Sequence, residues 1–411
     1  MGVIPEDWGV SSVGSEFTIQ LGKMLDAAKN IGVPKPYIGN RAVQWGQIDL
    51  ADLATVAMTP SDLKRFRLQR GDLLVCEGGE IGRAAIWNDP IPECYYQKAL
   101  HRLRPTRGYD VFLMMSLLQL WTSSGYLANY VTQTSIAHLP KDKFELVPLP
   151  VPPPFEQRAI TEALSDIDAL IGALDKLIAK KRAIKQAAMQ QLLTGQTRLP
   201  GFSGKWEKKR LGDLGTWRGG STPSMSNPRY WIGGTIPWLS SSDVRQGWIN
   251  DVSAKITPAA VTETSVPLIP PGSVIVVIRS GILRRFFPVA YTSHQVAINQ
   301  DLKALEPGTQ HDPKFLQHAL IGFERRLLLE CLKAGTTVES IDSTWFRAFE
   351  IEMPCFEEQT AIATVLSDMD AEIAALERRR DKTKQIKQGM MPQLLTGRIR
   401  LVNPSEAEEA A

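Results

Sequence analysis

Residues 152–199 read PPPFEQRAITEALSDIDALIGALDKLIAKKRAIKQAAMQQLLTGQTRL, and residues 354–401 read PCFEEQTAIATVLSDMDAEIAALERRRDKTKQIKQGMMPQLLTGRIRL. The two segments align without a gap at an offset of 202 positions, and 25 of the 48 positions are identical. Chance does not produce that similarity over this length, so the chain contains a long-period duplication.

The duplication extends upstream of both segments at lower identity. The offset there falls from 202 to 201 and then to 198, which places a few inserted residues of the second copy within 219–235. The aligned pairs are Thr134-Ser135-Ile136 with Thr336-Thr337-Val338, Gln97-Lys98 with Asn299-Gln300, Gly71 with Gly272, Pro36-Tyr37-Ile38 with Pro237-Trp238-Leu239, and Trp8 with Trp206. We therefore expect the order lobe, helix, lobe, helix along the chain.

The repeated segments carry the apolar spacing of a helix that pairs with another helix. Steps of four and three residues predict a narrow apolar seam. The seam residues are Ile160, Leu164, Ile167, Ile171, Leu174 and Ile178 in the first copy, and Ile362, Leu366, Met369, Ile373 and Leu376 in the second. Pro154 suits a first helical turn, and Gly195 and Gly397 suit a left-handed ending. Pro392 predicts a kink or an early end of the second helix.

About 39 helical residues would give a rod of roughly 58 Å. One amphipathic rod of that length cannot bury its seam alone, so we expect the two helices to form an antiparallel coiled coil with a lobe at each end and a pseudo-two-fold internal repeat. A helical hairpin that merely links domains is the alternative. The near-identity of the helices and the divergence of the lobes favour a spacer of fixed length between two different lobes.

Each lobe is expected to be α/β. Short β-rich runs follow turn glycines at 71–75 and 272–277, and helical stretches follow at 111–130 and 313–332. Polar and aromatic residues gather between the strands, in Tyr95-Tyr96-Gln97-Lys98 and in Trp238-Leu239-Ser240-Ser241-Ser242-Asp243. Loops that differ on a shared scaffold are common recognition sites.

Composition excludes several classes of protein. A chain with 43% hydrophobic and 22% charged residues is neither disordered nor fibrous, and it contains no apolar run of 18 residues. The N-terminal residues MGVIPEDWGV match no lipidation or secretion signal. The four cysteines lack metal-ligand spacing, so we expect buried thiols in a reducing cytoplasm and no metal. The net charge of +3 decides nothing about nucleic acid.

The search for catalytic motifs finds none. The glycine-rich residues 78–83 lack the Lys-Ser/Thr ending of a phosphate loop and predict a turn. Asn227-Pro228-Arg229-Tyr230 is similar to the Asn-Pro-Pro-Tyr signature of amino-methyltransferases, but no glycine-rich cofactor strand precedes it, so we predict a loop. The five histidines lie far from any serine or cysteine in a nucleophile context, and no carboxylate pair has acid/base spacing.

The doubled pattern PxxxEQxxI…LxxxDxxI…QxLLTG between two divergent lobes resembles the specificity subunit of type I restriction–modification systems. The resemblance covers the chain up to Val402, and it includes the lobe motifs Ile236-Pro237-Trp238-Leu239-Ser240 and Thr336-Thr337-Val338. Its motif residues are Pro152, Glu156, Gln157, Leu164, Asp168 and Gln191 to Gly195 in the first copy, and Pro354, Glu358, Gln359, Leu366, Asp370 and Gln393 to Gly397 in the second. This chain departs from the family pattern in two places. The apolar seam of the second copy stops after Leu376, and Pro392 lies near the end of the second helix.

The resemblance implies two target recognition domains, at 1–151 and 200–353, each reading half of a bipartite asymmetric sequence in double-stranded DNA. The helical segments 152–199 and 354–402 would fix the unread spacer, and residues 403–411 would be a disordered tail. The family has no catalytic activity and no cofactor of its own. Two modification (methyltransferase) subunits and restriction (translocase/endonuclease) subunits would be its partners, in the cytoplasm and without a membrane.

Base edges in the major groove select arginine or lysine for guanine, and asparagine or glutamine for adenine. Candidate DNA contacts are therefore Arg41, Gln44, Arg83, Tyr96, Gln97 and Lys98 in the first lobe, and Ser241, Arg245, Arg279, Arg284, Arg285 and Gln300 in the second. For any one of them, a solvated charge or a hydrogen bond within the fold is the alternative. For the whole protein, the alternatives are a stand-alone enzyme that recognises and methylates DNA, and a coiled-coil scaffold that binds no DNA.

Overall fold

The structure is a computed structural model, and it describes residues 4–26, 30–132, 137–249, 252, 254–333 and 338–402. The expected tail at 403–411, the triplet Thr134-Ser135-Ile136, and Thr336-Thr337 lie outside the described residues. The chain divides into two compact units. Unit 1 is Met1–Leu174 with Arg379–Ala411, and unit 2 is Asp175–Arg378.

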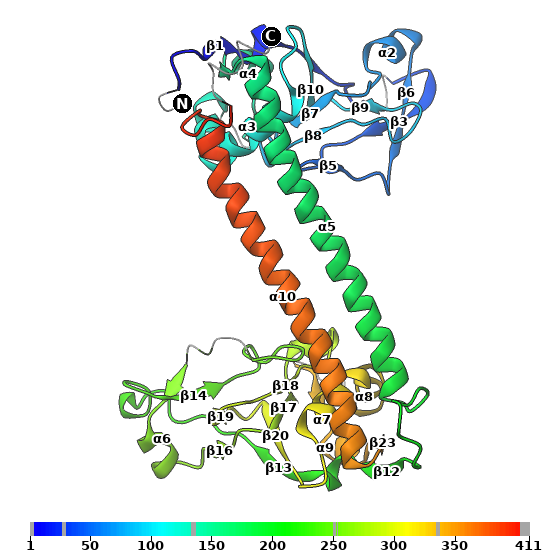
Figure 1. The fold of residues 1–411 in the computed structure, drawn as a ribbon, viewed down its shortest axis with the longest axis vertical. Helices are drawn as coiled ribbons and strands as arrows, with labels where there is room; N and C mark the ends of the chain where they lie inside the picture. Colours follow the sequence, from blue (N-terminus) through cyan, green and yellow to red (C-terminus); the bar gives the residue numbers. More distant parts are fainter. Residues whose placement is uncertain are drawn as a thin grey trace. The chain divides into compact units, whose positions relative to one another are not determined.

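The two repeated segments are single long helices. Helix α5 spans Pro154–Leu192 and helix α10 spans Phe356–Leu394, 39 residues each (Figure 1). Each unit therefore contains the amino-terminal part of one long helix and the carboxyl-terminal part of the other. The predicted length is confirmed, and so are the left-handed glycines after the helices, with φ of 68° at Gly195 and 69° at Gly397. Pro392 does not end α10 early, because the helix runs through it to the position equivalent to the end of α5.

The lobe of unit 1 is built on two larger sheets and two small ones. The four-stranded antiparallel sheet has the order β2-β10-β7-β8, and the three-stranded sheet has the order β6-β3-β9, in which β3 and β9 run parallel. Pairs β1–β11 and β4–β5 complete the lobe. The bounds are β1 Gly9–Ser12, β2 Phe17–Leu21, β3 Val33–Ile38, β4 Val43–Gln44, β5 Gln47–Ile48, β6 Ala54–Met58, β7 Leu73–Cys76, β8 Ala84–Ile86, β9 Tyr95–Tyr96, β10 Leu100–Pro105 and β11 Pro148–Val151.

The lobe of unit 2 repeats this plan. Its main sheet has the order β13-β20-β17-β18, and its second sheet has the order β15-β14-β19-β16, with β14 and β19 parallel. Pairs β12–β23 and β21–β22 complete it. The bounds are β12 Glu207–Arg210, β13 Gly215–Gly219, β14 Ile236–Leu239, β15 Lys255–Ile256, β16 Leu268–Ile269, β17 Val274–Val277, β18 Val289–Tyr291, β19 Val296–Ile298, β20 Leu302–Pro307, β21 Leu332–Lys333, β22 Ser340–Ile341 and β23 Glu350–Met353.

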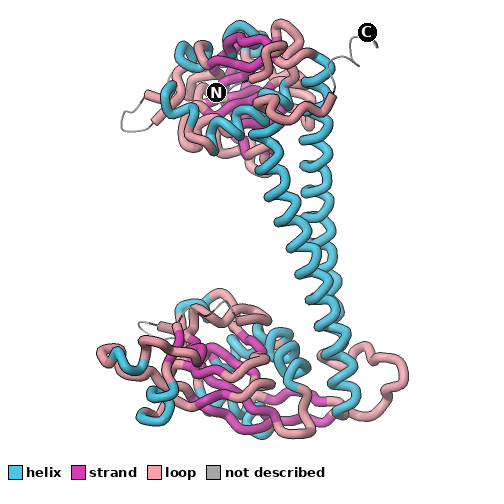
Figure 2. The backbone as a smooth tube through the Cα atoms, turned by 60° about the vertical axis from the view of Figure 1, so that its left-hand side comes forward, coloured by secondary structure: helices cyan, strands magenta, loops and turns pink. Residues whose placement is uncertain are grey.

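Equivalent strands fall where the sequence alignment predicts them. Strands β2 and β13 are related by 198 positions, whereas the ends of β3 and β14 are related by 201. Three residues are therefore inserted in the connection 220–235, inside the predicted stretch. Figure 2 shows that the strands of each unit gather within its lobe, beside the shorter helices.

The short helices follow the expected stretches with one break in each. Residues 111–130 form α3 (Val111–Ser123) and the 3-10 helix η1 (Tyr126–Tyr130), which Gly125 separates with a φ of 72°. Residues 313–332 form α7 (Pro313–Gly322) and α8 (Glu324–Cys331). The other short helices are α1 Val13–Glu16, α2 Pro60–Arg65, α4 Lys141–Glu145, η2 Leu211–Asp213, η3 Pro228–Tyr230, α6 Pro258–Glu263, η4 Gly281–Arg284 and α9 Ser343–Ala348.

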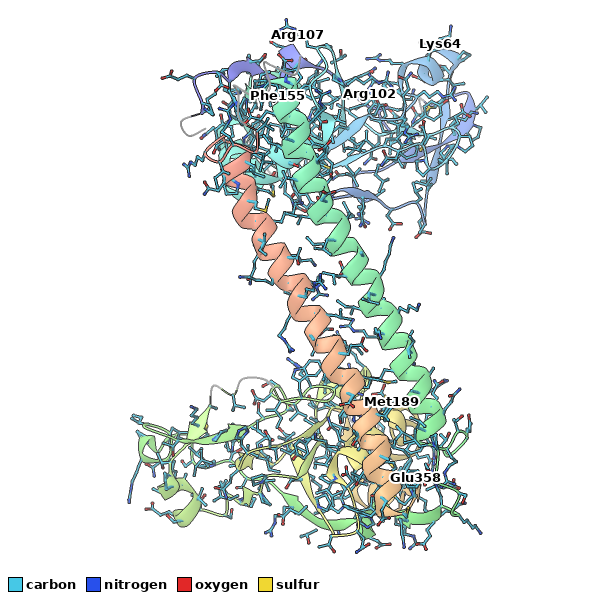
Figure 3. The ribbon with its side chains drawn as sticks, in the orientation of Figure 1. Lys64, Arg102, Arg107, Phe155, Met189 and Glu358 are labelled. Carbon is cyan, nitrogen blue, oxygen red and sulfur yellow. The ribbon has the colours of Figure 1, made fainter. Side chains whose placement is uncertain are left out.

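Both long helices contribute to the core of each unit. In unit 1, Ile160 and Leu164 of α5 pack in one cluster with Met391 and Leu394 of α10. In unit 2, Ile362 and Leu366 of α10 pack with Met189 and Leu192 of α5. Figure 3 shows Met189 on α5 and Glu358 on α10 in this region. The first two residues of the predicted apolar seam of each helix are thus buried in the core of a unit.

Candidate nucleic-acid interface

The lobes share one structural feature that collects most of the predicted DNA contacts. In unit 1 the parallel strands β3 and β9 end side by side, with Ile38 opposite Tyr96. In unit 2 the parallel strands β14 and β19 end with Leu239 opposite Ile298. We call the segments that follow them the strand-end edges. They are residues 39–44 with 97–98 in unit 1 and residues 240–245 with 299–300 in unit 2.

Backbone contacts hold each strand-end edge together. The Gln97 amide donates to the Ile38 carbonyl at 3.0 Å, and the Asn299 amide donates to the Leu239 carbonyl at 2.9 Å. Gly22 and Gly220, equivalent at an offset of 198, cross directly behind these segments. A Cβ atom at Gly22 would lie 2.3 Å from the Tyr96 carbonyl oxygen, and one at Gly220 would lie 2.1 Å from that of Asn299. Only glycine allows so close an approach.

Four predicted residues of unit 1 lie on its strand-end edge. Arg41 is exposed, and its guanidinium has no hydrogen bond or ion pair with any residue that the structure describes. Gln44 is exposed, and its Nε2 donates to the Arg41 carbonyl at 2.8 Å. Gln97 is half-buried with its amide beside Gly39, and Lys98 is exposed. The fold thus places side by side four predicted residues that are distant along the chain.

Tyr96 has a different place from the one predicted. Its ring is completely buried against Phe66, its hydroxyl lies 3.4 Å from the Gln20 carbonyl, and burial raises the pKa of the phenol. A side chain in the core cannot touch a DNA molecule on the surface. We therefore correct the prediction and leave Tyr96 out of the candidate interface.

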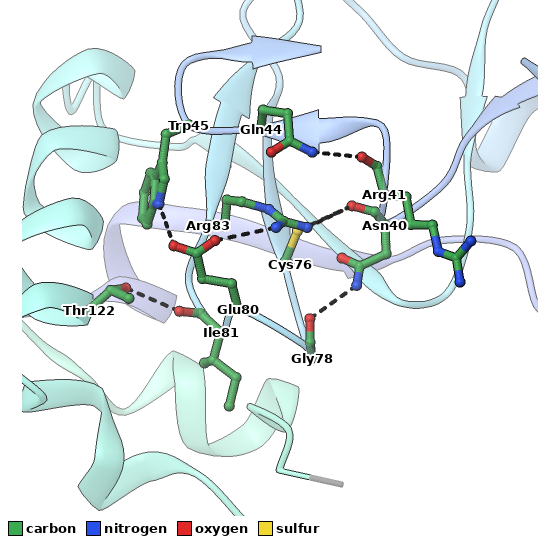
Figure 4. A network of polar contacts seen from close by, with 10 residues as sticks. All are labelled: Asn40, Arg41, Gln44, Trp45, Cys76, Gly78, Glu80, Ile81, Arg83 and Thr122. Atoms are coloured by element: carbon green, nitrogen blue, oxygen red, sulfur yellow. Dashed lines mark hydrogen bonds and ion pairs between the residues drawn. The ribbon is translucent and has the colours of Figure 1, made fainter. Parts of the chain in front are cut away.

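Arg83 lies in the turn between β7 and β8, next to the strand-end edge of unit 1 (Figure 4). One terminal nitrogen donates to the Asn40 carbonyl at 3.1 Å, and the other lies 3.3 Å from the Glu80 carboxylate. Glu80 also accepts a hydrogen bond from the Trp45 indole at 2.7 Å. The glycine-rich residues 78–83 are a turn, as predicted, and Arg83 is occupied within it.

The strand-end edge of unit 2 carries different side chains. Ser241 and Arg245 are half-buried, and Gln300 is exposed and accepts a hydrogen bond from the Thr222 hydroxyl at 2.6 Å. The Arg245 guanidinium has no partner among the described residues. Arg245 and Gln300 match the positions of Gln44 and Lys98 in the fold, and Ser241 matches that of Asn40, but the side-chain chemistry differs.

The three remaining arginines of unit 2 lie in the connection between β17 and β18. Arg279 pairs with Asp301 at 2.6 Å, and Arg284 pairs with Glu339 and thereby lowers the pKa of that carboxyl. Arg285 is exposed, with no ion pair or hydrogen bond from its side chain to the part of the chain that the structure describes. Of these three, Arg285 is the one whose guanidinium is available for a ligand.

The glutamates of the repeated motif have a structural role that the sequence reasoning did not assign. Glu156 is fully buried and accepts hydrogen bonds from Trp8 at 2.8 Å and from Arg400. Glu358 is also fully buried and accepts them from Trp206 at 3.2 Å and from Arg198 at 2.6 Å. The internal alignment could have indicated this role, because it pairs Arg198 with Arg400 and Trp8 with Trp206.

The glutamines of the motif tie each long helix to its lobe. The Gln157 side-chain oxygen accepts from the Asp110 amide at 3.0 Å, and that of Gln359 accepts from the Asp312 amide at 3.0 Å. Asp110 and Asp312 cap α3 and α7 in turn. The motif therefore stabilises the junction between helix and lobe.

The structure corrects one detail about reactive side chains. Cys76, Cys94 and Cys331 are buried as predicted, but Cys355 is exposed just before α10. The Nε2 of His318 lies 3.4 Å from the hydroxyl of Ser367, which lies inside the long helix α10 and in no nucleophile motif. Burial lowers the pKa of His318 to about 4, and the pair lies where α7 packs on α10.

Asn227-Pro228-Arg229-Tyr230 lies on the short helix η3, where Arg229 pairs with Glu263 at 2.8 Å.

Two further findings concern the described residues as a whole. They contain no group of three or more histidine, cysteine or acidic side chains that could hold a metal ion. None of the helices in the described part of the chain is both long and apolar enough to span a membrane.

Comparison with known proteins defines the class. The profile of the type I restriction modification DNA specificity domain matches the chain twice, over residues 5–184 and 203–388. The chain belongs to this family. It is 31% identical over 223 residues to the type I restriction enzyme EcoR124I/EcoR124II specificity subunit of Escherichia coli. That match covers 54% of this chain and 55% of the relative, so the chain spans about half of that protein.

Other matches extend over the full length. The chain is 23% identical over 428 residues to the type I restriction enzyme MjaVIII specificity subunit of Methanocaldococcus jannaschii, covering 97% of this chain and 95% of the relative. The crystal structure of the type I restriction-modification S subunit from M. genitalium has a TM-score of 0.59 at 14% identity and covers 94% of this chain and 96% of its own. A chain from a structure on complex assembly and conformational transition of the type I R-M system also has a TM-score of 0.59, at 18% identity, with coverage of 97% and 100%. These two structures share the fold.

Proposed function

We propose that this chain is the DNA sequence-specificity subunit of a type I restriction–modification complex. Each lobe reads one half of a bipartite, asymmetric target in double-stranded DNA. The observation that carries the proposal is the presence of two family domains that present equivalent strand-end edges with different side chains. A shared scaffold with unlike reading residues is what recognition of two unlike half-sites requires.

The proposed DNA contacts are the predicted polar side chains that are exposed or half-buried and form no ion pair. Arginine suits guanine, and glutamine suits adenine in the major groove, while lysine and serine also contact phosphates. Side chains that are buried or ion-paired are excluded from this set, which removes Tyr96, Arg83, Arg279 and Arg284. The proposed contacts are Arg41, Gln44, Gln97 and Lys98 in unit 1, and Ser241, Arg245, Arg285 and Gln300 in unit 2.

The long helices are proposed to form an antiparallel coiled coil that fixes the unread spacer. Within unit 2, Lys181 of α5 lies 2.7 Å from Glu372 of α10, and Lys185 pairs with Asp370. Within unit 1, Asp168 of α5 lies 2.7 Å from Lys387 of α10. Later residues of α5 thus pair with earlier residues of α10, which supports the antiparallel direction. On this proposal the recognition domains are 1–151 and 200–353, and the spacer helices are 152–199 and 354–402.

Two methyltransferase subunits, and restriction subunits for cleavage, are the proposed partners in the cytoplasm. Leu170, Leu177 and Ile184 follow one another at seven-residue intervals on α5 and are 39–44% exposed. A heptad row of exposed apolar residues suits a further helix from another protein. The partners would supply the methyl-transfer chemistry.

The decisive experiment is to express the chain with its methyltransferase subunits and to map the methylated positions in the host genome. We expect one bipartite motif with a constant gap, and DNA binding by the complex that weakens with salt. Methyl transfer by the isolated chain would instead identify a stand-alone enzyme. A complex that assembles but retains DNA without sequence preference would support the scaffold interpretation.

A further inference from the structure

The turn at residues 39–45 is held at both of its ends by the neighbouring turn between β7 and β8 (Figure 4). At the first end, the Asn40 side-chain amide donates to the Gly78 carbonyl at 3.0 Å, and the Asn40 carbonyl accepts from Arg83 at 3.1 Å. At the other end, the Trp45 indole donates to Glu80 at 2.7 Å. Arg83 and Glu80 pair with each other at 3.3 Å, so the two anchors form one network.

The network occupies both terminal nitrogens of Arg83 and leaves Arg41 free. The Arg83 side chain is 16% exposed, and its Nε is buried without a hydrogen-bond partner among the described residues. Arg41 lies between the two anchors, and Figure 4 shows its side chain directed away from the network. The Gln44 amide donates to the Arg41 carbonyl and so holds the backbone of the turn between the anchors.

We propose that Arg83, together with Asn40 and Glu80, is a positioning residue that determines how the first lobe reads its half-site without touching DNA. Arg41 and Gln44 are the residues that it presents. This inference rests on the proposed function, and it assigns different roles to two arginines that the sequence alone cannot distinguish.

The physical reason is the precision that base recognition demands. A bidentate contact to a base edge needs its donor atoms within about 0.5 Å of the productive position. A turn without anchors samples several backbone conformations, so a reading side chain on it accepts more than one base. Loss of the network should therefore broaden the base preference with an unchanged salt slope. If Arg83 instead contacted a phosphate, its loss would weaken binding to all sequences alike and reduce the salt slope by about one.

The test uses the full chain assembled with its methyltransferase subunits, and duplexes that carry every single base-pair change in both half-sites. Relative binding constants and the slope of log K against log salt are measured for Arg83→Met, Arg83→Lys and Arg41→Met. For both Arg83 variants we expect discrimination to fall roughly ten-fold at one or more positions of one half-site. The other half-site and the salt slope should stay as in the wild type.

For Arg41→Met we expect weaker binding to the best duplex and loss of discrimination at the one base pair that Arg41 reads. Arg83→Lys is informative because it keeps the charge but cannot bridge Asn40 and Glu80 at once. Glu80→Gln keeps an acceptor for Trp45 and removes the charge facing Arg83, so it should broaden the same half-site by a smaller factor. If the Arg83 variants do not fold, the Glu80→Gln variant tests the positioning role in their place. Arg285→Met is the matched control in unit 2 and should affect only the other half-site.

Four results would overturn the inference. They are a salt slope smaller by about one for Arg83→Met with unchanged base preferences, full rescue by Arg83→Lys, broadening of both half-sites, and no change in any network variant. If the wild-type complex itself shows no bipartite preference, the proposed function fails. If that preference is present and the Arg83 variants leave it intact, the positioning role alone fails.

Discussion

Glu156 and Glu358 occupy equivalent positions, but their surroundings differ by one charge. Arg400 pairs with Glu156 and also with Asp7 at 2.7 Å, whereas Arg198 pairs with Glu358 alone among the described carboxylates. The pKa of Asp7 is lowered by its hydrogen bond with Arg400. Unit 1 therefore retains one carboxylate beside its arginine when the buried glutamate is removed, and unit 2 does not.

We predict that Glu358→Ala destabilises unit 2 by about 3 kcal/mol, because it leaves a partly buried arginine without its carboxylate and an indole donor without its acceptor. Glu156→Ala should cost less, because Asp7 remains for Arg400. Chemical denaturation of the two variants, followed by tryptophan fluorescence, measures the difference. Equal losses in the two variants would show that Asp7 contributes nothing, and Asp7→Asn combined with Glu156→Ala is the control.

His101 is fully buried in unit 1, where its Nε2 lies 2.9 Å from the Leu139 carbonyl and burial lowers its pKa to about 4. Because the unfolded chain binds a proton below pH 6.5 and the folded chain does not, stability is full above pH 6.5 and is lost as the pH falls toward 4. His101→Gln keeps a donor for the Leu139 carbonyl. It should reduce the loss of unfolding free energy between pH 7 and pH 5 by roughly 2 kcal/mol. Denaturation midpoints at pH 7 and pH 5 test it, and an unchanged pH dependence would contradict it.

Residue types predicted the region that we propose for recognition, but they did not predict the state of each side chain. Arg41 and Arg83 are equally good candidates for guanine in the sequence, yet one is free and the other is ion-paired. Tyr95 and Tyr96 form a two-residue strand whose side chains are both fully buried, so inward–outward alternation could not have shown that Tyr96 lies in the core. These distinctions depend on partners that lie far away in sequence, such as Asn40 for Arg83 and Phe66 for Tyr96.

Helix α5 carries two apolar rows with different environments. Leu164 belongs to the seam and is fully buried in the core of unit 1, whereas Leu170 is 39% exposed on the same helix. We predict that Leu164→Ala costs about 2–5 kcal/mol in unfolding free energy. Leu170→Ala should cost less than about 0.5 kcal/mol but weaken assembly with the methyltransferase subunits.

Calorimetry on both leucine variants and titration with the purified methyltransferase subunit separate the two effects. A large stability loss for Leu170→Ala would mean that this residue packs within the fold. Undisturbed assembly would remove the partner surface proposed on α5.

The bounds of the two long helices were the most predictable part of the fold. Local signals such as the turn glycines 71 and 272 and the closing glycines 195 and 397 act through backbone conformation, so they need no tertiary context. Pro392 was a weaker guide because it lies in the last turn of α10. A missing amide hydrogen bond costs less there, and Met391 and Leu394 on either side of it are buried in the core of unit 1.

For the whole molecule, the spacer proposal predicts the effect of helix length. Four residues inserted near Gly195 add about 6 Å of helix, which is close to two base pairs of DNA. The mapped methylation motif should therefore acquire a longer gap with both half-sites unchanged. Altered half-sites with the original gap would count against a spacer role, and four residues inserted in the connection 220–235 are the control.

The duplication, the two long helices, the α/β lobes and the family were all determined by the sequence alone. Periodicity, turn residues and a repeat at a constant offset are local or self-comparing signals, and they survive without knowledge of the fold. The tertiary structure decided which long-range partners complete each unit. It joined Trp8 and Arg400 at Glu156, divided each core between both helices, and occupied Arg83 while leaving Arg41 free, because burial and pairing depend on contacts between distant parts of the chain.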